Sequence, residues 1–226
     1  MKKIAEGTLN NKSYVVRHLS TADLSAIETL QAKVYASLED QSVLQPLTTE
    51  EFNEILHQEK MMIGVFVQDQ LIGFRALLEP PIDEEHLGYD CQIDEEAFSR
   101  VLYQEISNVA PEYRGFGLQR KMAAWSMAQI DEEKYDYICS TVKPGNIPSL
   151  KDKFSQGLIV RALKIKYVDK LRYVFFKDLR NSAPNYTEII EIDMNDIEGQ
   201  QSLLKEGYVG TKLEKKADQW LVLYEK

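Results

Sequence analysis

The sequence is poor in cysteine, which bears on both metal binding and cellular compartment. Only Cys91 and Cys139 occur in 226 residues, and neither has another Cys or a His at the spacing of a metal site. A chain of this length with two thiols is typical of a reducing compartment rather than of a disulfide scaffold. We therefore expect no metal and a cytoplasmic location.

The sequence also lacks an excess of positive charge. It carries 27 Lys and Arg against 36 Asp and Glu, a formal net charge of −9. Binding to nucleic acid relies on clustered Lys and Arg that displace counterions, so we expect no nucleic-acid partner. The acidic surface is explained by solubility, and a site tuned for cationic amines is the alternative.

Long apolar runs are absent as well. No stretch approaches the roughly 20 apolar residues that a membrane-spanning helix needs. The first residues, MKKIAEGTLNNKSY, have two lysines but no apolar core of signal-peptide length. We expect a chain that is not associated with a membrane.

Hydrophobic periodicity predicts a mixed α/β sheet. Apolar alternation predicts strands, and spacing of three to four residues with capping residues predicts helices. The expected strands are 13–19, two around a polar turn at 68–70, 101–109, 135–142 and a final pair within 158–179; the expected helices are 20–38, 48–58, one after 117, and 146–156. Strands 101–109 and 135–142 should be parallel, because a helix joins them.

The last residues differ in character from the rest. After RNSAPNY the sequence predicts a strand at 188–193, a helix at 196–205 and a hairpin formed by 208–213 and 220–224. We expect a main domain over residues 1–180 and a C-terminal appendage or subdomain with βαββ order over residues 181–226. This segment could serve in protein interaction, with dimerisation through the strand 220–224 as one form.

One short motif carries most of the chemical information. The stretch NVAPEYRGFGLQRKM places Arg114, Gly115 and Gly117 between an apolar strand and an amphipathic helix. A Walker loop would need Gly-Lys-Ser/Thr, and a dinucleotide fingerprint would need a third glycine at Arg120, so both fail. Two interpretations remain: an ordinary tight turn, or a helix N-terminus that binds a diphosphate through backbone N–H groups, with Arg114 adding charge.

The same stretch resembles the central motif of the GCN5-related N-acetyltransferase (GNAT) superfamily. The matching residues are Val109, Pro111, Tyr113, Arg114, Gly115, Gly117 and Leu118, while Gln119 stands where the family more often has Gly or Ala. The element order also looks like that of the family over about three quarters of the chain. The resemblance implies an acyl-CoA N-acyltransferase fold and transfer of an acetyl group from acetyl-CoA to a primary amine of a small molecule or a peptide.

The resemblance also implies the site. Glu105 would be the general base; a solvated or ion-paired strand residue is the other interpretation. Acetyl-CoA, as co-substrate, would contact Ser107, Asn108, Val109, Arg114, Gly115, Phe116, Gly117, Leu118, Gln119, Arg120, Asn146 and Ser149. Asn146 is equally well placed to cap the helix that follows it.

The sequence departs from the family pattern at the general acid. The family often has a Tyr seven residues after the position of Asn146, and here Lys153 and Phe154 occupy that region. Tyr137, Tyr167 and Tyr173 are the alternative candidates for that role. This departure leaves a second possible function, a catalytically silent acyl-CoA sensor on the same fold. A homodimer is a further expectation.

His86 lies in the acidic insert. It either lines an acceptor site or is a surface histidine, and the second is the simpler interpretation.

Overall fold

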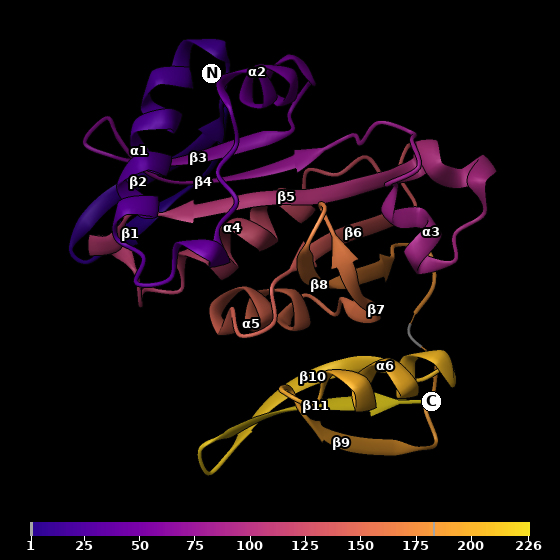
Figure 1. Cartoon of the computed structure of the whole chain (residues 1–226). Helices are drawn as coiled ribbons and strands as arrows, with labels where there is room; N and C mark the ends of the chain where they lie inside the picture. Colours follow the sequence, from indigo (N-terminus) through magenta and orange to yellow (C-terminus); the bar gives the residue numbers. More distant parts are fainter. Residues whose placement is uncertain (1, 183) are drawn as a thin grey trace. The chain divides into compact units, whose positions relative to one another are not determined.

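The computed structural model describes residues 2–182 and 184–226 (Figure 1). The chain divides into two compact units. The first unit contains Met1–Glu79 and Gln104–Ile130, and the second contains Pro80–Tyr103 and Asp131–Lys226. The predicted boundary between residues 180 and 181 stays a prediction.

The first unit is built on antiparallel strands. β1 (Lys3–Leu9), β2 (Lys12–His18), β3 (Met62–Val67) and β4 (Gln70–Leu78) follow one another in the sheet, and β4 is followed by β5 (Val101–Val109). Asn10 and Asn11 both have positive φ, 48° and 60°, in the turn between β1 and β2. This is the backbone of a tight hairpin turn, for which Asn is well suited.

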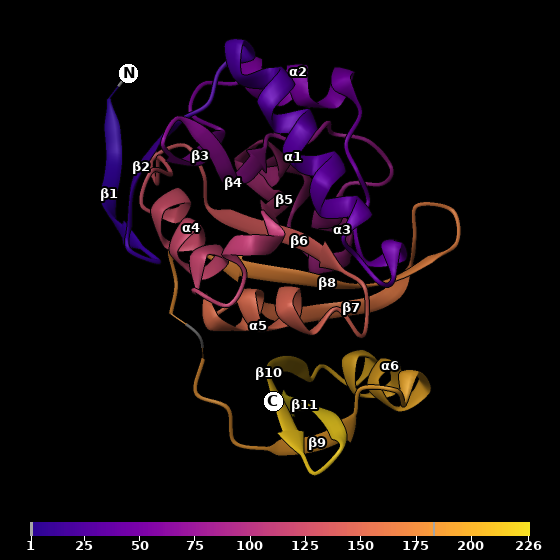
Figure 2. The same cartoon turned by 90° about the vertical axis from the view of Figure 1, so that its left-hand side faces the viewer.

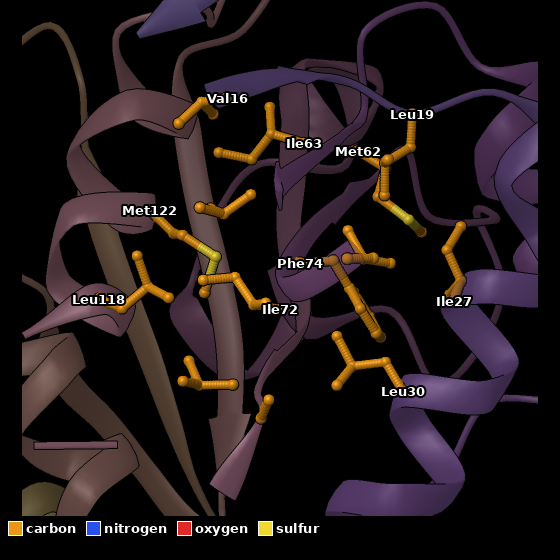
Figure 3. Packing of buried hydrophobic residues seen from close by; sticks show 14 of the residues in the cluster. Val16, Leu19, Ile27, Leu30, Met62, Ile63, Ile72, Phe74, Leu118 and Met122 are labelled. Carbon is orange, nitrogen blue, oxygen red and sulfur yellow. The ribbon is translucent and has the colours of Figure 1, made fainter. Parts of the chain in front are cut away.

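Three helices complete the first unit: α1 (Leu24–Ala36), α2 (Thr49–His57) and α4 (Leu118–Met127). Figure 3 shows Leu118 and Met122 of α4 on one side of the strands, and Ile27 and Leu30 of α1 on the other. Phe74 of β4 is fully buried and meets Phe52 of α2 edge to face, with ring centroids 5.9 Å apart. The hydrophobic core therefore holds both helix layers against the strands that lead to the turn after β5.

The second unit continues from the first residues of β5. Val101 of β5 pairs in parallel with Tyr137 of β6 (Tyr137–Val142), as the joining helix predicts, and β6 pairs in antiparallel with β8 (Lys170–Asp178). β7 (Ile159–Lys166) pairs in antiparallel with β8. The prediction of a mixed, mostly antiparallel sheet with one parallel pair is confirmed.

The second unit also contains the C-terminal elements, visible at the yellow end of the colour scale in Figure 2. They are β9 (Ile189–Asp193), α6 (Ile197–Lys205), β10 (Val209–Lys216) and β11 (Gln219–Glu225). Gly210 of β10 pairs with Val160 of β7, and β11 lies between β10 and β9. Both edges of the strand 220–224 are thus occupied, so a partner cannot pair with its backbone.

The structure adds elements that the sequence analysis missed. β1 precedes the expected first strand, and the polar insert holds α3 (Leu87–Cys91) and a short 3-10 helix, Glu95–Arg100. The expectation of a surface histidine in this insert is wrong. His86 is 1% exposed, because its ring stacks on Phe98 at 4.1 Å and its Nδ1 accepts a hydrogen bond from the Gly88 N–H.

Candidate functional site

The turn between β5 and α4 is shaped by two glycines. Gly115 has φ of +83° and Gly117 has φ of +70°, values that residues with a side chain rarely adopt. A Cβ built at either position would meet no atom within 4 Å. The backbone here is therefore open to the close approach of another molecule.

The first turn of α4 is left uncapped. Gly117 is the N-cap residue and supplies no side-chain hydrogen bond to the start of the helix, and the first turn contains no acidic residue. In α2, by contrast, Thr48 and Glu51 form a capping box. Because free N–H groups and the helix dipole both favour negative charge, the start of α4 has the physical properties of an anion site.

The charges around this turn are arranged by contacts with α1. Nη2 of Arg114 donates to Oγ of Ser37 at 2.8 Å, and Nζ of Lys33 donates to Oε1 of Glu112 at 2.5 Å. The hydrogen bond from Lys33 lowers the pKa of Glu112. Lys33 thus offsets the negative charge of Glu112, and the positive charges of Arg114 and Arg120 remain exposed.

Side chains near the end of β5 alternate between the two faces of the strand. Glu105 and Ser107 lie half-buried on one face of the strand, whereas Gln104 and Asn108 are buried on the other. Gln104 accepts a hydrogen bond from Nη2 of Arg75 at 2.6 Å. Neither side-chain polar atom of Asn108, which is 1% exposed, has a hydrogen-bond partner among the described residues.

Solved structures of low sequence identity share this architecture. An acetyltransferase from Salmonella typhimurium, solved with its cofactor acetyl-CoA, matches 76% of this chain and 98% of its own, with 14% identity and a TM-score of 0.55. A ribosomal-protein-alanine N-acetyltransferase from Brucella melitensis matches 73% and 99%, with 18% identity and a TM-score of 0.52. The diaminobutyrate acetyltransferase of Paenibacillus lautus, in complex with its substrate and coenzyme A, matches 73% and 95%, with 14% identity and a TM-score of 0.52.

The chain has the GNAT fold. No protein-family model matches the sequence, and no curated protein matches it significantly. The fold is therefore established by structure, while activity and substrate rest on the residues of the site.

The predicted residues of the GNAT site fall in both units. Glu105, Ser107, Asn108, Val109 and the residues 114–120 belong to the first unit, and Asn146 and Ser149 to the second. Oδ1 of Asn146 accepts from the Ser149 N–H at 3.3 Å and caps α5 (Ile147–Ser155). The capping interpretation of Asn146 is confirmed, and its contact with CoA stays a prediction.

The residues considered as general acid are held in different surroundings. Lys153, at the usual Tyr position, is 7% exposed with its Nζ 3.9 Å from Oδ2 of Asp152. Tyr173 is fully buried and donates to Oε1 of Gln200 at 2.7 Å, and burial raises the pKa of its hydroxyl. Tyr167 is 47% exposed, and its hydroxyl lies 3.2 Å from Oγ1 of Thr141. Burial and a higher pKa make Tyr173 a poor proton donor.

The described residues lack two features. Among the described residues, no group of three or more His, Cys, Asp or Glu is arranged to hold a metal ion. Within the same residues, no helix is long and apolar enough to cross a membrane.

Lys33 and Ser37 are residues of the site that could not be identified from the sequence. They lie 79 and 77 residues from their partners, Glu112 and Arg114, and no local pattern marks them.

Proposed function

We propose that the chain is an acyl-CoA-dependent N-acyltransferase that moves an acetyl group from acetyl-CoA to a primary amine. The observation that supports the proposal most strongly is the turn at Gly115 and Gly117, after the end of β5. This turn leads into α4, whose N-cap provides no side-chain hydrogen bond and whose first turn contains no acidic residue. The GNAT fold supports it, since the Salmonella structure of this fold was solved with acetyl-CoA. The diphosphate would lie on the backbone N–H groups at the start of α4, with Arg114 beside it.

The reaction needs a base before anything else. An ammonium ion cannot attack a thioester, so it first loses a proton. Glu105 is the residue for this step, directly or through a water, because it stands on β5 close before the turn that would hold the cofactor. A backbone N–H near Val109 would stabilise the oxyanion of the tetrahedral intermediate.

The leaving group is the CoA thiolate. A thiol has a pKa of about 8.5, so a thiolate leaves without a strong general acid near neutral pH. The departure from the family pattern at Lys153 therefore does not prevent the reaction. It does motivate the second candidate, a silent acyl-CoA sensor that binds the same ligand without turnover.

The acceptor class is a primary amine of a small molecule or a peptide. The two kinds occur among proteins of this fold, as the diaminobutyrate and ribosomal-protein-alanine enzymes illustrate.

The ring of Trp220 contacts cations of the protein itself. Nζ of Lys151 and Nζ of Lys215 lie 4.7 and 5.9 Å from the centre of the ring. A homodimer stays a prediction, and it cannot form by backbone pairing at β11, because β10 and β9 occupy both edges of that strand.

The test follows free thiol release from acetyl-CoA with a panel of amines. We expect release that depends on an amine and falls strongly in Glu105→Gln, because the base is lost. Glu54→Gln, at an exposed acid on α2, is the matched control and should keep wild-type release. Thermal stabilisation by acetyl-CoA without release on any amine would support the sensor instead, and no stabilisation would contradict both.

A further inference from the structure

Arg172 on β8 is a buried arginine without a carboxylate partner. The residue is 8% exposed, and its Nη1 donates to the backbone oxygen of its own neighbour, Leu171, at 2.9 Å. Among residues 2–182 and 184–226, this side chain makes no ion pair and no further hydrogen bond. Burial lowers the pKa of Arg172, and Tyr167 raises it to a smaller extent. Because buried charges are normally paired, the guanidinium has capacity for an anion that the fold does not supply.

Other arginines of the chain show how this fold pairs a guanidinium. Nη1 and Nη2 of Arg17 donate to the Asp23 carboxylate at 2.9 and 2.7 Å. Nε and Nη2 of Arg100 donate to the Asp136 carboxylate at 2.5 and 2.7 Å. Arg172 is more deeply buried than these two half-buried residues, yet it lacks the acid that both of them have.

Arg172 lies on the face of β7 and β8 against which α3 packs. Val174, two residues on and therefore on the same face of β8, belongs to a buried cluster with Cys91 of α3. Lys164 of β7 is the cross-strand partner of Arg172, and its Nζ donates to Oδ1 of Asp90 on α3 at 2.7 Å. The neighbours of Arg172 along and across the strands thus both face α3.

Two lysines on this face have acidic partners. Asp90 pairs with Lys164 through Oδ1 at 2.7 Å and with Lys166 through Oδ2 at 3.2 Å. Glu85 pairs with Lys166 at 2.9 Å. These two acids therefore offset the charges of the two lysines, and the charge of Arg172 is left over.

Hydroxyl groups lie close to Arg172. Tyr167, in the turn between β7 and β8, is 47% exposed, and its hydroxyl lies 3.2 Å from Oγ1 of Thr141 on β6. Thr141 is the register partner of Val174, so it lies on the face that carries Arg172. Since a hydroxyl can donate to an anion, these surroundings favour the same kind of ligand.

Tyr167 also lies close to the strand of the proposed base. Burial and, to a smaller extent, Tyr167 raise the pKa of the Tyr103 hydroxyl on β5. This hydroxyl accepts from the Leu87 N–H of α3 at 2.5 Å. Glu105 follows Tyr103 by two residues and shares its face of β5. The anion would therefore belong to the molecule that presents its amine to Glu105.

A carboxylate is the anion that fits a single guanidinium best. The planar N–H groups of arginine match the two oxygens of a carboxylate. One unpaired cation offsets one negative charge, whereas a phosphate monoester carries about two near neutral pH.

We propose that Arg172 binds a carboxylate of the acceptor, so that the amine substrate is an amino acid or a short peptide with a free carboxylate. The inference rests on the proposed function and names its substrate class. Arg172 binds and orients the acceptor and takes no part in bond making.

The experiment compares amines that differ only in the carboxylate. Free amino acids, dipeptides and the carboxamides of both are tested by thiol release from acetyl-CoA with wild type and Arg172→Met. For the wild type, kcat/KM should be about tenfold or more higher for the best acid than for its amide. Arg172→Met should lower kcat/KM for that acid by about 10- to 100-fold, mainly through KM, with the amide within about twofold of wild type.

Further variants separate binding from structure. Arg172→Lys keeps the charge but loses the planar donors, so it should retain part of the preference for the acid. Arg161→Met is the matched control on β7, where Cζ of Arg161 lies 5.7 Å from the centre of the Phe176 ring, and it should keep the full preference. Without substrate, the thermal midpoint of Arg172→Met should equal or exceed that of wild type, because a buried unpaired charge is removed. If Arg172→Met does not fold, Arg172→Gln is measured with the same expected loss.

Four outcomes overturn the inference: equal kcat/KM for acid and amide in the wild type, an unchanged preference in Arg172→Met, an equal loss for both substrates, or faster release with O-phosphoethanolamine than with any acid. Each of them leaves amine-dependent thiol release intact. Release with no amine at all would instead contradict the proposed function, and this inference with it. The two failures are therefore distinguishable.

Discussion

Arg114 and Ser37 join the turn after β5 to the C-terminal end of α1 by a hydrogen bond of 2.8 Å between Nη2 and Oγ. The bond holds an exposed guanidinium beside the uncapped start of α4. Because Arg presents several donors in a fixed plane, it can keep the contact with Ser37 and still donate to a phosphate. The charge is thus oriented before a ligand arrives.

Removing this charge should weaken CoA binding. Arg114→Ala should raise the dissociation constant of CoA about tenfold or more, since a hydrogen bond to a charged group contributes about 1.5–3 kcal/mol. Ser37→Ala removes only the orienting bond and should have a smaller effect in the same calorimetric titration. Equal affinity of wild type and Arg114→Ala would show that the guanidinium does not contact the ligand.

Substitution at Gly117 tests the turn itself. Gly117→Val places a β-branched residue at φ of +70° and covers the N–H groups of α4, so CoA binding should be lost almost completely. Gln119→Ala, two residues on, should leave affinity nearly unchanged. Circular dichroism verifies that both variants are folded. Comparable affinities of wild type and Gly117→Val for CoA would show that the turn does not bind this ligand.

The Asp136 carboxylate gives a pH dependence of stability. Nε and Nη2 of Arg100 donate to it at 2.5 and 2.7 Å, and Arg180 adds a contact at 2.5 Å. The hydrogen bonds from Arg100 lower the pKa of Asp136 below its ordinary value of about 3.9. Stabilisation is therefore complete above that pH and is lost as the pH falls through the lowered pKa of the folded state.

Asp136→Asn should therefore have a lower thermal midpoint than wild type between neutral pH and about pH 5, and this difference should shrink below about pH 4. Asp218→Asn, at an exposed turn in the same unit, should match the wild type throughout. A deficit of Asp136→Asn that is equally large at acid pH would contradict the assignment.

Gln200 connects α6 to two buried tyrosines. Its Oε1 accepts from the hydroxyls of Tyr173 and Tyr224 at 2.7 and 3.1 Å, and its Nε2 donates to Met194 O at 2.8 Å. Gln200→Leu should reduce the free energy of unfolding by about 2 kcal/mol or more, because buried hydroxyls lose their acceptor. Denaturant titration measures this, with exposed Ser202→Ala as control; a stability equal to wild type would refute the role of Gln200.

Local signals made part of this structure predictable. The Thr48–Glu51 capping box, the helix start after Gly117 and the polar turn before β4 are each encoded within a few residues, and the structure contains all three. β1 was missed because its sequence, KIAEGTL, mixes Gly and charged residues and most of the strand stays exposed or half-buried. Alternation of apolar residues is weak in such an edge strand.

The site was predictable only where it is contiguous in sequence. The glycine turn could be identified from residues 114–117, but its contacts with Lys33 and Ser37 depend on tertiary packing. His86 shows that tertiary packing can also overturn a prediction made from local sequence. Its acidic neighbours predict a surface loop, whereas stacking on Phe98, twelve residues later, buries the ring, and this burial lowers its pKa.

The proposed function depends on the binding of acyl-CoA at the turn between β5 and α4. Calorimetric titration of acetyl-CoA into the full chain measures it most directly. We expect saturable binding at one site per chain, accompanied by a rise in the thermal midpoint. No heat of binding and no change in the midpoint at saturating acetyl-CoA would contradict it.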